Sequence, residues 1–409
     1  MLVTNPMGSA AQRSSGPDRL HLWLSDGARV YDVGPFFDAE THTVASALLF
    51  AQNKLFLLHE SYRKRNHIVF LTELSAQLQQ IKSVLGTWKE VDKKVSTHCG
   101  SVAGGGARPG AACVAPMPTK GLVGFLSGNV TTHEWNDEYL GVNAVVTGAV
   151  ETTANGLTFK GRGAWAEWPV GKQGQNQRYY FANYNFTLVA MVTIHAVPAG
   201  GSGPLSLLGV RPEGGAAAMS VSYDEQQRWQ LVYGGRVLQA STGTWETGKA
   251  YQVALVVQEG RGSVYVDGYF QLASQESWKS GTSKEISHFF IGEDGGSADG
   301  ERNADNVRVM VGDVLLYNRP LSAEALLDHF REPKSAAPPP STSPKAASAH
   351  ISSSSATDAA SGVNADHNAR TEMPPSAKAK NKHADGCGCA SRVLLLLLLL
   401  LGLWVFAAL

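Results

Sequence analysis

The chain has no excess of charge of either sign. Lysine and arginine together number 35, aspartate and glutamate also number 35, and the formal net charge at pH 7 is zero. Without a basic field, the composition does not favour a nucleic acid or an anionic membrane surface as a partner. We therefore expect no nucleic-acid ligand.

Cysteines are few, and no metal-ligand pattern is present. The four cysteines form two close pairs, Cys99 with Cys113 and Cys387 with Cys389. No second Cys or His pair lies at the spacing of a zinc site, so we expect no metal and no cofactor. In an oxidising compartment, Cys99 and Cys113 are predicted to form a disulfide across a Gly- and Ala-rich segment. The alternative is that the acidic segment from Glu293 to Asp305 binds calcium.

The amino-terminal segment lacks the features of a secretory signal, whereas the carboxyl terminus has a strong membrane signal. Residues 1–18 contain no basic start and no apolar core. Val393 to Leu409 is almost wholly apolar, and small residues and a short polar spacer precede it. This order predicts a glycosylphosphatidylinositol (GPI) attachment signal, with Asp385 as the preferred attachment residue and Gly386 or Cys387 as alternatives. An ordinary carboxyl-terminal membrane helix is the alternative to the whole signal.

An anchor signal without a signal peptide is a contradiction. It is resolved if the chain is the 3′ part of a longer protein or a truncated gene copy. The predicted location is then the outer leaflet of the plasma membrane, provided that the parent protein carries a signal peptide. Asn129 and Asn185 each begin an Asn-x-Thr sequon, and these predicted N-glycosylation sites fit a surface glycoprotein.

Hydrophobic patterning predicts a mainly β protein with one long helix. Five short strand-like runs lie between Leu20 and Leu71, too few to close a β architecture alone. Apolar residues from Thr72 to Val95 recur at helical spacing, with Thr72 as the expected N-cap. Residues 120–333 carry alternating runs and the hairpin turn Asp267–Gly268, which predict a two-sheet antiparallel sandwich. Ser322 is expected to cap a short closing helix.

Residues 334–384 are of low complexity. They are rich in Ser, Thr, Ala and Pro and have almost no large apolar side chains, so they are predicted to form a disordered, O-glycosylated stalk. The predicted organisation is a first β segment at 1–71, a connecting helix and loop at 72–119, the sandwich at 120–333, the stalk at 334–384 and the attachment signal at 385–409.

Residues Val309 to Leu321, VMVGDVLLYNRPL, resemble the signature Val-x-Val-x-Asn-Val-x-Leu-Tyr-Asn-Arg of the trypanosome trans-sialidase superfamily. The match departs at Asp313, where the family usually has Asn, and at Met310, where it often has Thr. Other similar segments run from Leu20 to Pro35, around Lys82 to Trp88 and through the sandwich. The resemblance implies the last part of a sialidase β-propeller, a connecting helix, a concanavalin A/laminin G-like sandwich and a GPI tail.

What the resemblance implies about catalysis depends on position 45. Active members are retaining glycosidases that use a tyrosine nucleophile paired with a glutamate, an arginine triad and an aspartate acid/base. Matching Ser46–Phe50 and Lys54–Leu55 to the family places Ala45 at the nucleophile position and Glu60 at that of an arginine-orienting glutamate. Alanine has no nucleophilic atom, so we expect that the chain is not an enzyme. A fragment of an active exo-α-sialidase or trans-sialidase is the alternative.

The resemblance further implies adhesion to host-cell or extracellular-matrix proteins, or to glycans, or a part in immune evasion. The expected ligand-binding residues lie on the signature segment: Val309, Val311, Val314, Leu316, Tyr317, Asn318 and Arg319. Tyr317 and Arg319 are the expected hot spots if they are exposed, and core packing is the alternative for Tyr317. A gene fragment that is not stably made is a third interpretation, because an incomplete propeller leaves open strand edges.

Overall fold

The computed structural model describes residues 1–7, 19–36, 43–63, 66–97, 117–170, 179–199, 203–212, 215, 217–277, 285–293 and 307–327. The four cysteines, the predicted stalk, the attachment signal and the acidic segment beyond Glu293 lie outside these residues. Two compact units divide the chain, Met1–Ala337 and Pro338–Leu409, and all described residues belong to the first. Among the described helices, none combines the length and apolar character needed to cross a bilayer.

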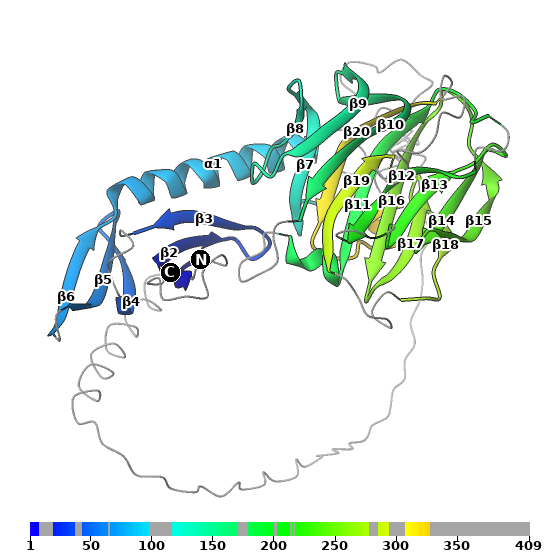
Figure 1. The fold of residues 1–409 in the computed structure, drawn as a ribbon. Helices are drawn as coiled ribbons and strands as arrows, with labels where there is room; N and C mark the ends of the chain where they lie inside the picture. Colours follow the sequence, from blue (N-terminus) through cyan, green and yellow to red (C-terminus); the bar gives the residue numbers. More distant parts are fainter. Residues whose placement is uncertain are drawn as a thin grey trace, which may run out of the picture. The chain divides into compact units, whose positions relative to one another are not determined.

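Two three-stranded antiparallel sheets come first in the chain (Figure 1). One contains β1 (Leu2–Met7), β2 (Arg19–Ser25) and β3 (Val30–Pro35), and the other β4 (Thr43–Ala51), β5 (Lys54–Arg63) and β6 (Asn66–Glu73). The five strand-like runs predicted between Leu20 and Leu71 are confirmed, while β1 was not predicted. Gln52 and Asn53 turn β4 into β5 with φ values of 51° and 60°, as a tight hairpin requires.

Helix α1 (Ser75–Thr97) follows β6. Its buried residues, Ile81, Trp88, Val91 and Val95, recur on one face. Ile81 and Trp88 belong to the predicted helical period. The predicted N-cap is wrong, because Thr72 pairs with Leu57 in the β5–β6 ladder and is therefore held in an extended conformation.

The remaining strands form one continuous antiparallel arrangement that folds back on itself as a sandwich. Its order is β15-β14-β13-β12-β19-β10-β9-β8-β7-β20-β11-β16-β17-β18. The bounds are β7 (Leu122–Val130), β8 (Glu134–Asp137), β9 (Ala144–Thr153), β10 (Gly156–Pro169), β11 (Phe186–Ile194), β12 (Leu205–Pro212), β13 (Met219–Tyr223), β14 (Arg228–Tyr233), β15 (Arg236–Thr244), β16 (Ala250–Gln258), β17 (Arg261–Val266), β18 (Tyr269–Ala273), β19 (Ile286–Gly292) and β20 (Arg308–Tyr317).

Strand β10 joins the two halves of this arrangement. Its first part, from Gly156 to Lys160, pairs with β20, and its second part, from Trp165 to Pro169, pairs with β19. Between them the register with β9 shifts, and Gly161 and Gly163 take φ values of 73° and 79°. Such left-handed backbone suits glycine, so these two residues let one strand bend from one sheet into the other.

The mainly β fold class is confirmed, as are the predicted hairpin and closing helix. Asp267 and Gly268 link β17 to β18 with positive φ values of 52° and 77°. The described part of the closing helix is α2 (Ala323–Leu327), and the Ser322 hydroxyl accepts the Ala325 N–H at 3.2 Å, as an N-cap does. A short 3-10 turn, η1 (Tyr180–Asn183), precedes β11.

Candidate functional site

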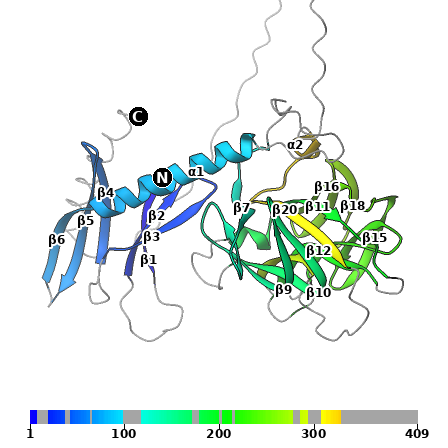
Figure 2. The ribbon, with the colours of Figure 1, turned by 90° about the horizontal axis from the view of Figure 1, so that it is seen from above.

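The signature segment forms β20 and the turn after it. β20 pairs with β11, β7 and β10, and Figure 2 shows it among these strands. All its predicted ligand-binding side chains up to Tyr317 are buried, with exposures of 3% or less: Val309, Val311, Val314, Leu316 and Tyr317. In this structure these five side chains pack in the core and do not reach the surface.

Tyr317 packs in the core. Its side chain is fully buried, and its hydroxyl has no hydrogen-bond partner in the described part of the chain. Burial raises the pKa of this phenol far above its usual range. The condition for a hot-spot role, an exposed Tyr317, is therefore not met in this structure.

The two polar residues that end the signature hold separate segments together. Asn318 Nδ2 donates to the Ala28 carbonyl at 3.0 Å, and Arg319 Nε donates to the Lys120 carbonyl at 2.9 Å. Both side chains are only partly exposed. They therefore link the sandwich to the β2–β3 turn and to the segment before β7.

Asp313, where the sequence departs from the signature, lies in a left-handed conformation with φ of 47°. Asn and Asp tolerate this region better than other non-glycine residues, so the departure keeps the backbone geometry. Its backbone N–H donates to the Asn155 carbonyl at 2.9 Å, and its carboxylate accepts the Asn155 side-chain amide at 3.1 Å.

Ala45 and Glu60 lie directly opposite each other on β4 and β5. Opposite residues of an antiparallel pair project from the same side of the sheet, so a tyrosine at position 45 would stand beside Glu60. The Glu60 carboxylate instead contacts His67 Nδ1 at 2.6 Å. The structure therefore brings together the two positions that the resemblance assigns to the nucleophile and to an arginine-orienting glutamate.

Sequence reasoning missed a buried cluster centred on Arg29, in the β2–β3 turn. The Arg29 guanidinium donates to both Asp92 oxygens, at 2.5 and 3.3 Å, and to Asp26 at 3.0 Å, while its Nε donates to the Leu122 carbonyl at 2.8 Å. It also lies 4.1 Å from the centre of the Tyr139 ring. One arginine thus joins the first sheet, α1 and the sandwich. The sequence gave no signal for it, because its partners Asp92 and Leu122 lie 63 and 93 residues further along the chain.

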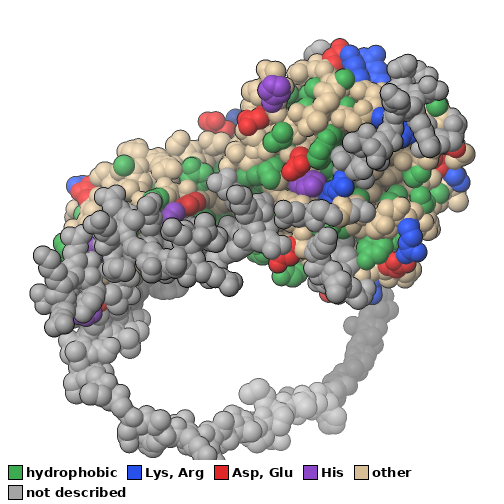
Figure 3. Space-filling view, viewed as in Figure 1, with side chains coloured by type: hydrophobic (Ala, Val, Ile, Leu, Met, Phe, Trp, Pro, Cys, Tyr) green, Lys and Arg blue, Asp and Glu red, His purple; other side chains and the backbone are tan. Residues whose placement is uncertain are grey.

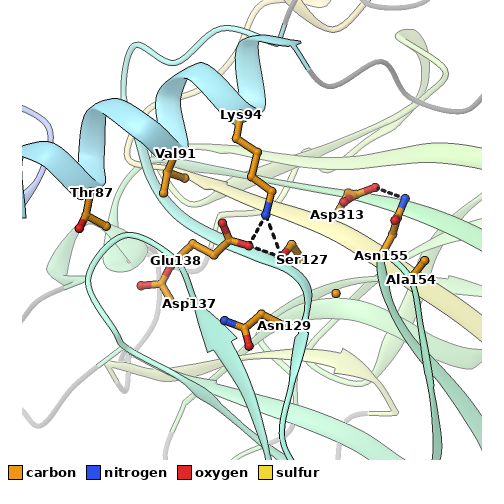
Figure 4. Close-up of a pocket in the computed structure, with 11 residues that line it drawn as sticks. Thr87, Val91, Lys94, Ser127, Asn129, Asp137, Glu138, Ala154, Asn155 and Asp313 are labelled. Atoms are coloured by element: carbon orange, nitrogen blue, oxygen red, sulfur yellow. Dashed lines mark hydrogen bonds and ion pairs between the residues drawn. The ribbon is translucent and has the colours of Figure 1, made fainter. Parts of the chain in front are cut away.

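A polar pocket of about 650 Å³ lies where α1 meets the sandwich (Figure 4). Lys94 of α1 donates to Glu138 at 2.6 Å and to the Ser127 hydroxyl at 3.4 Å. The predicted glycosylation residue Asn129, on β7, lines the pocket on the side of the sandwich. The lining residues are Thr87, Val91, Lys94, Ser127, Gly128, Asn129, Asp137, Glu138, Ala154, Asn155 and Asp313.

Metal ligands do not gather in the described residues, where no group of three His, Cys, Asp or Glu side chains lies close enough to hold an ion. Glu293, the one described residue of the acidic segment, accepts the Gly163 N–H at 2.6 Å. Acidic and basic side chains are interspersed on the molecular face in Figure 3.

The sequence matches two known domain families. The trans-sialidase C-terminal domain matches residues 118–324, and the BNR repeat-like domain matches residues 1–66. A Trypanosoma cruzi protein named Sialidase is 36% identical over 323 residues, which are 78% of this chain and 27% of that protein. Sialidase 85-1.1 of the same organism is 32% identical over 351 residues, 83% of this chain and 44% of that protein.

Solved structures of sialidases also resemble this chain. Trypanosoma rangeli sialidase is 38% identical with a TM-score of 0.64, and the match covers 80% of this chain and 50% of that one. The same sialidase in complex with sialic acid is 39% identical with a TM-score of 0.64. The chain thus spans half or less of the length of these proteins. The resemblance in the signature segment is confirmed, and the chain belongs to the trans-sialidase superfamily.

Proposed function

We propose that this chain is a non-catalytic, GPI-anchored surface glycoprotein that acts in adhesion to host-cell or matrix proteins or in immune evasion. The observation that carries the proposal is Ala45. A retaining sialidase needs a nucleophilic atom at this position, and Ala45, opposite the arginine-orienting position Glu60, offers only a methyl group.

The contact between Glu60 and His67 supports the same proposal. The Glu60 carboxylate is engaged by His67, a side chain that is 57% exposed. The resemblance assigns this glutamate to the orientation of an arginine, and its carboxylate contacts a histidine instead. The pair then serves as a cross-strand contact between β5 and β6.

A chimera tests the catalytic half of the proposal. Residues 1–97 replace the corresponding segment of Trypanosoma rangeli sialidase, and hydrolysis of a fluorogenic sialoside and sialic-acid transfer from a sialylated lactose are measured. We expect no turnover with Ala45 and turnover with Ala45→Tyr, the matched control. Turnover by the Ala45 chimera would overturn the proposal and favour the alternative, a fragment of an active sialidase, to which the named relatives also point.

The adhesive surface is proposed to lie at exposed aromatic residues, since the signature strand is buried. Tyr269 and Phe270, at the start of β18, are 63% and 57% exposed. Exposed tyrosines and phenylalanines are the side chains that protein interfaces favour. Binding of the full chain to host cells and to immobilised matrix proteins is compared with that of a Tyr269→Ser/Phe270→Ser double variant. Val237→Ser, at a 45% exposed residue of β15, is the control.

We expect the double variant to lose binding and the control to keep it. Equal binding by both variants would place the contact elsewhere. Release of the protein from expressing cells by a phosphatidylinositol-specific phospholipase tests the anchor, and Asp385→Pro in the same cells should abolish that release. Retention of wild-type protein after phospholipase treatment would argue for the ordinary membrane helix.

A further inference from the structure

The two sequons occupy different environments. Asn129 is exposed, its Oδ1 accepts the Asn136 side-chain amide at 3.0 Å, and its Nδ2 donates no hydrogen bond to the described residues. Thr131, the third residue of that sequon, is also exposed. A glycosyltransferase needs both the Asn amide and the Thr hydroxyl. Both residues are exposed in the folded chain, although the Thr131 hydroxyl donates to the Glu134 carbonyl and accepts the Glu134 N–H, each at 3.2 Å.

The second sequon is built into the fold. Thr187 is fully buried, and its hydroxyl donates to the Arg319 carbonyl and accepts the Leu321 N–H, both at 2.9 Å. Asn185 Oδ1 accepts the Glu259 N–H at 2.8 Å. Once β11 has formed, this sequon is closed to an enzyme, so Asn129 is the acceptor that stays available.

Asn129 is also part of the wall of the α1–sandwich pocket (Figure 4). With about 650 Å³, the pocket lies in the size range of small-molecule sites. Its polar groups match what a sugar offers. Lys94 Nζ uses two of its three donors, on Glu138 and Ser127, and the Asn155 and Asp313 side chains face the same space.

We propose that Asn129 carries an N-linked glycan whose first sugars occupy this pocket and connect α1 to the sandwich. A glycan fixed at the pocket wall binds as an intramolecular ligand, so its effective concentration exceeds that of any free sugar. The sugars contact Lys94 from α1 and Asn155 from the β9–β10 turn at the same time. The inference rests on the proposed surface location, because that route supplies N-glycosylation, and it is independent of adhesion and of catalysis.

The test uses the full chain, expressed behind an added secretion signal in a eukaryotic host that makes short high-mannose glycans. Intact mass, with Asn129→Gln and Asn185→Gln as references, gives the occupancy of each sequon. The rate of glycan release by peptide-N-glycosidase is then compared between native and denatured protein. We expect occupancy at Asn129 and native release at least about tenfold slower than release after denaturation.

Two variants fill the pocket without touching the sequon. Ala154 is exposed and lines the pocket, and Thr87 lies on the α1 side, where its hydroxyl donates to the Ser83 carbonyl. Ala154→Trp or Thr87→Trp should leave occupancy unchanged and restore fast native release. Hydrogen exchange at Val91–Val95 of α1 should be slower in the glycosylated protein than in Asn129→Gln.

Each other outcome overturns the inference. If Asn129 is unmodified, the pocket has no glycan to hold. If the glycan is released quickly from the native wild-type chain, its sugars lie in solvent. If release is slow and neither pocket-filling variant changes it, the surroundings of Asn136, and not the pocket, protect the glycan from the glycosidase. Binding of free chitobiose to Asn129→Gln, with fast release of the attached glycan, would make the pocket a site for foreign sugars.

Discussion

Replacement of Arg29 should separate the first sheet and α1 from the sandwich. The side chain is only 4% exposed, and it donates at the same time to Asp92 of α1 and to the Leu122 carbonyl of β7. Tyr139 completes the cluster, because its hydroxyl donates to Asp92 at 2.8 Å. Arg29→Ala therefore removes contacts with all three parts at once.

The expected cost of Arg29→Ala is about 3 kcal/mol. Removing one partner of a buried ion pair costs about 3–5 kcal/mol when the remaining charge is left unsolvated. Here the remaining carboxylates, Asp92 and Asp26, are 33% and 31% exposed, so water can replace part of the guanidinium and the low end applies. Arg236→Ala is the matched control, because that side chain is 73% exposed and its pair with Glu276 spans 3.5 Å; it should cost less than about 1 kcal/mol.

Denaturant unfolding and hydrogen exchange together measure this prediction. We expect a lower free energy of unfolding for Arg29→Ala and faster exchange in β2, β3 and α1, with β11 and β16 unchanged. Arg29→Lys should recover only part of the loss, because an ammonium cannot fork onto a carboxylate and also reach the Leu122 carbonyl. Equal effects of Arg29→Ala and Arg236→Ala, or faster exchange spread evenly over all strands, would refute the reasoning.

Three further predictions concern stability. Gly86→Ala should stabilise the protein by about 0.5–1 kcal/mol in thermal unfolding, because Gly86 lies inside α1 and an added Cβ meets nothing within 4 Å; a destabilised variant would contradict this. Thr187→Val should cost about 1–3 kcal/mol, even in a host that does not glycosylate, because it leaves the buried Leu321 N–H unsatisfied, whereas Thr131→Val at the surface should cost little. Burial lowers the pKa of His59, so the unfolded state takes up a proton near pH 6.5 that the folded state takes up only at lower pH. Stability should therefore fall as the pH drops below about 6.5, and the fall should be smaller in His59→Gln than in the wild-type chain. An unchanged pH profile in that variant would exclude the assignment.

Local sequence patterns predicted the elements whose conformation depends mainly on residues close together in the chain. Apolar residues at helical spacing between Thr72 and Val95, Ile81 and Trp88 among them, predicted α1, and Asp267–Gly268 predicted its hairpin. Thr72 failed as a cap because pairing with Leu57, a contact across β5 and β6, outweighed a local preference.

The surroundings of the candidate residues depended on distant contacts. Tyr317 could not be assigned to core or surface, because seven consecutive residues of β20, from Val311 to Tyr317, are buried and alternation is lost. The Arg29 cluster and the α1–sandwich pocket bring together residues that are far apart in the chain, and no spacing rule connects them. Position 45 was different, since the motif next to it supplied an alignment and the structure supplied the pairing with Glu60.

The bend in β10 has a consequence for how the sandwich folds. This strand pairs with β20 over one half and with β19 over the other, so its own pairing is complete only when both of these distant strands are in place. The pairing partners are more than 120 residues apart in the chain, as in Trp165 with Gly292, so closure requires a large loss of loop entropy before the contacts form. The sandwich should therefore fold slowly and unfold as one cooperative unit, with β10 as the last strand to acquire full protection.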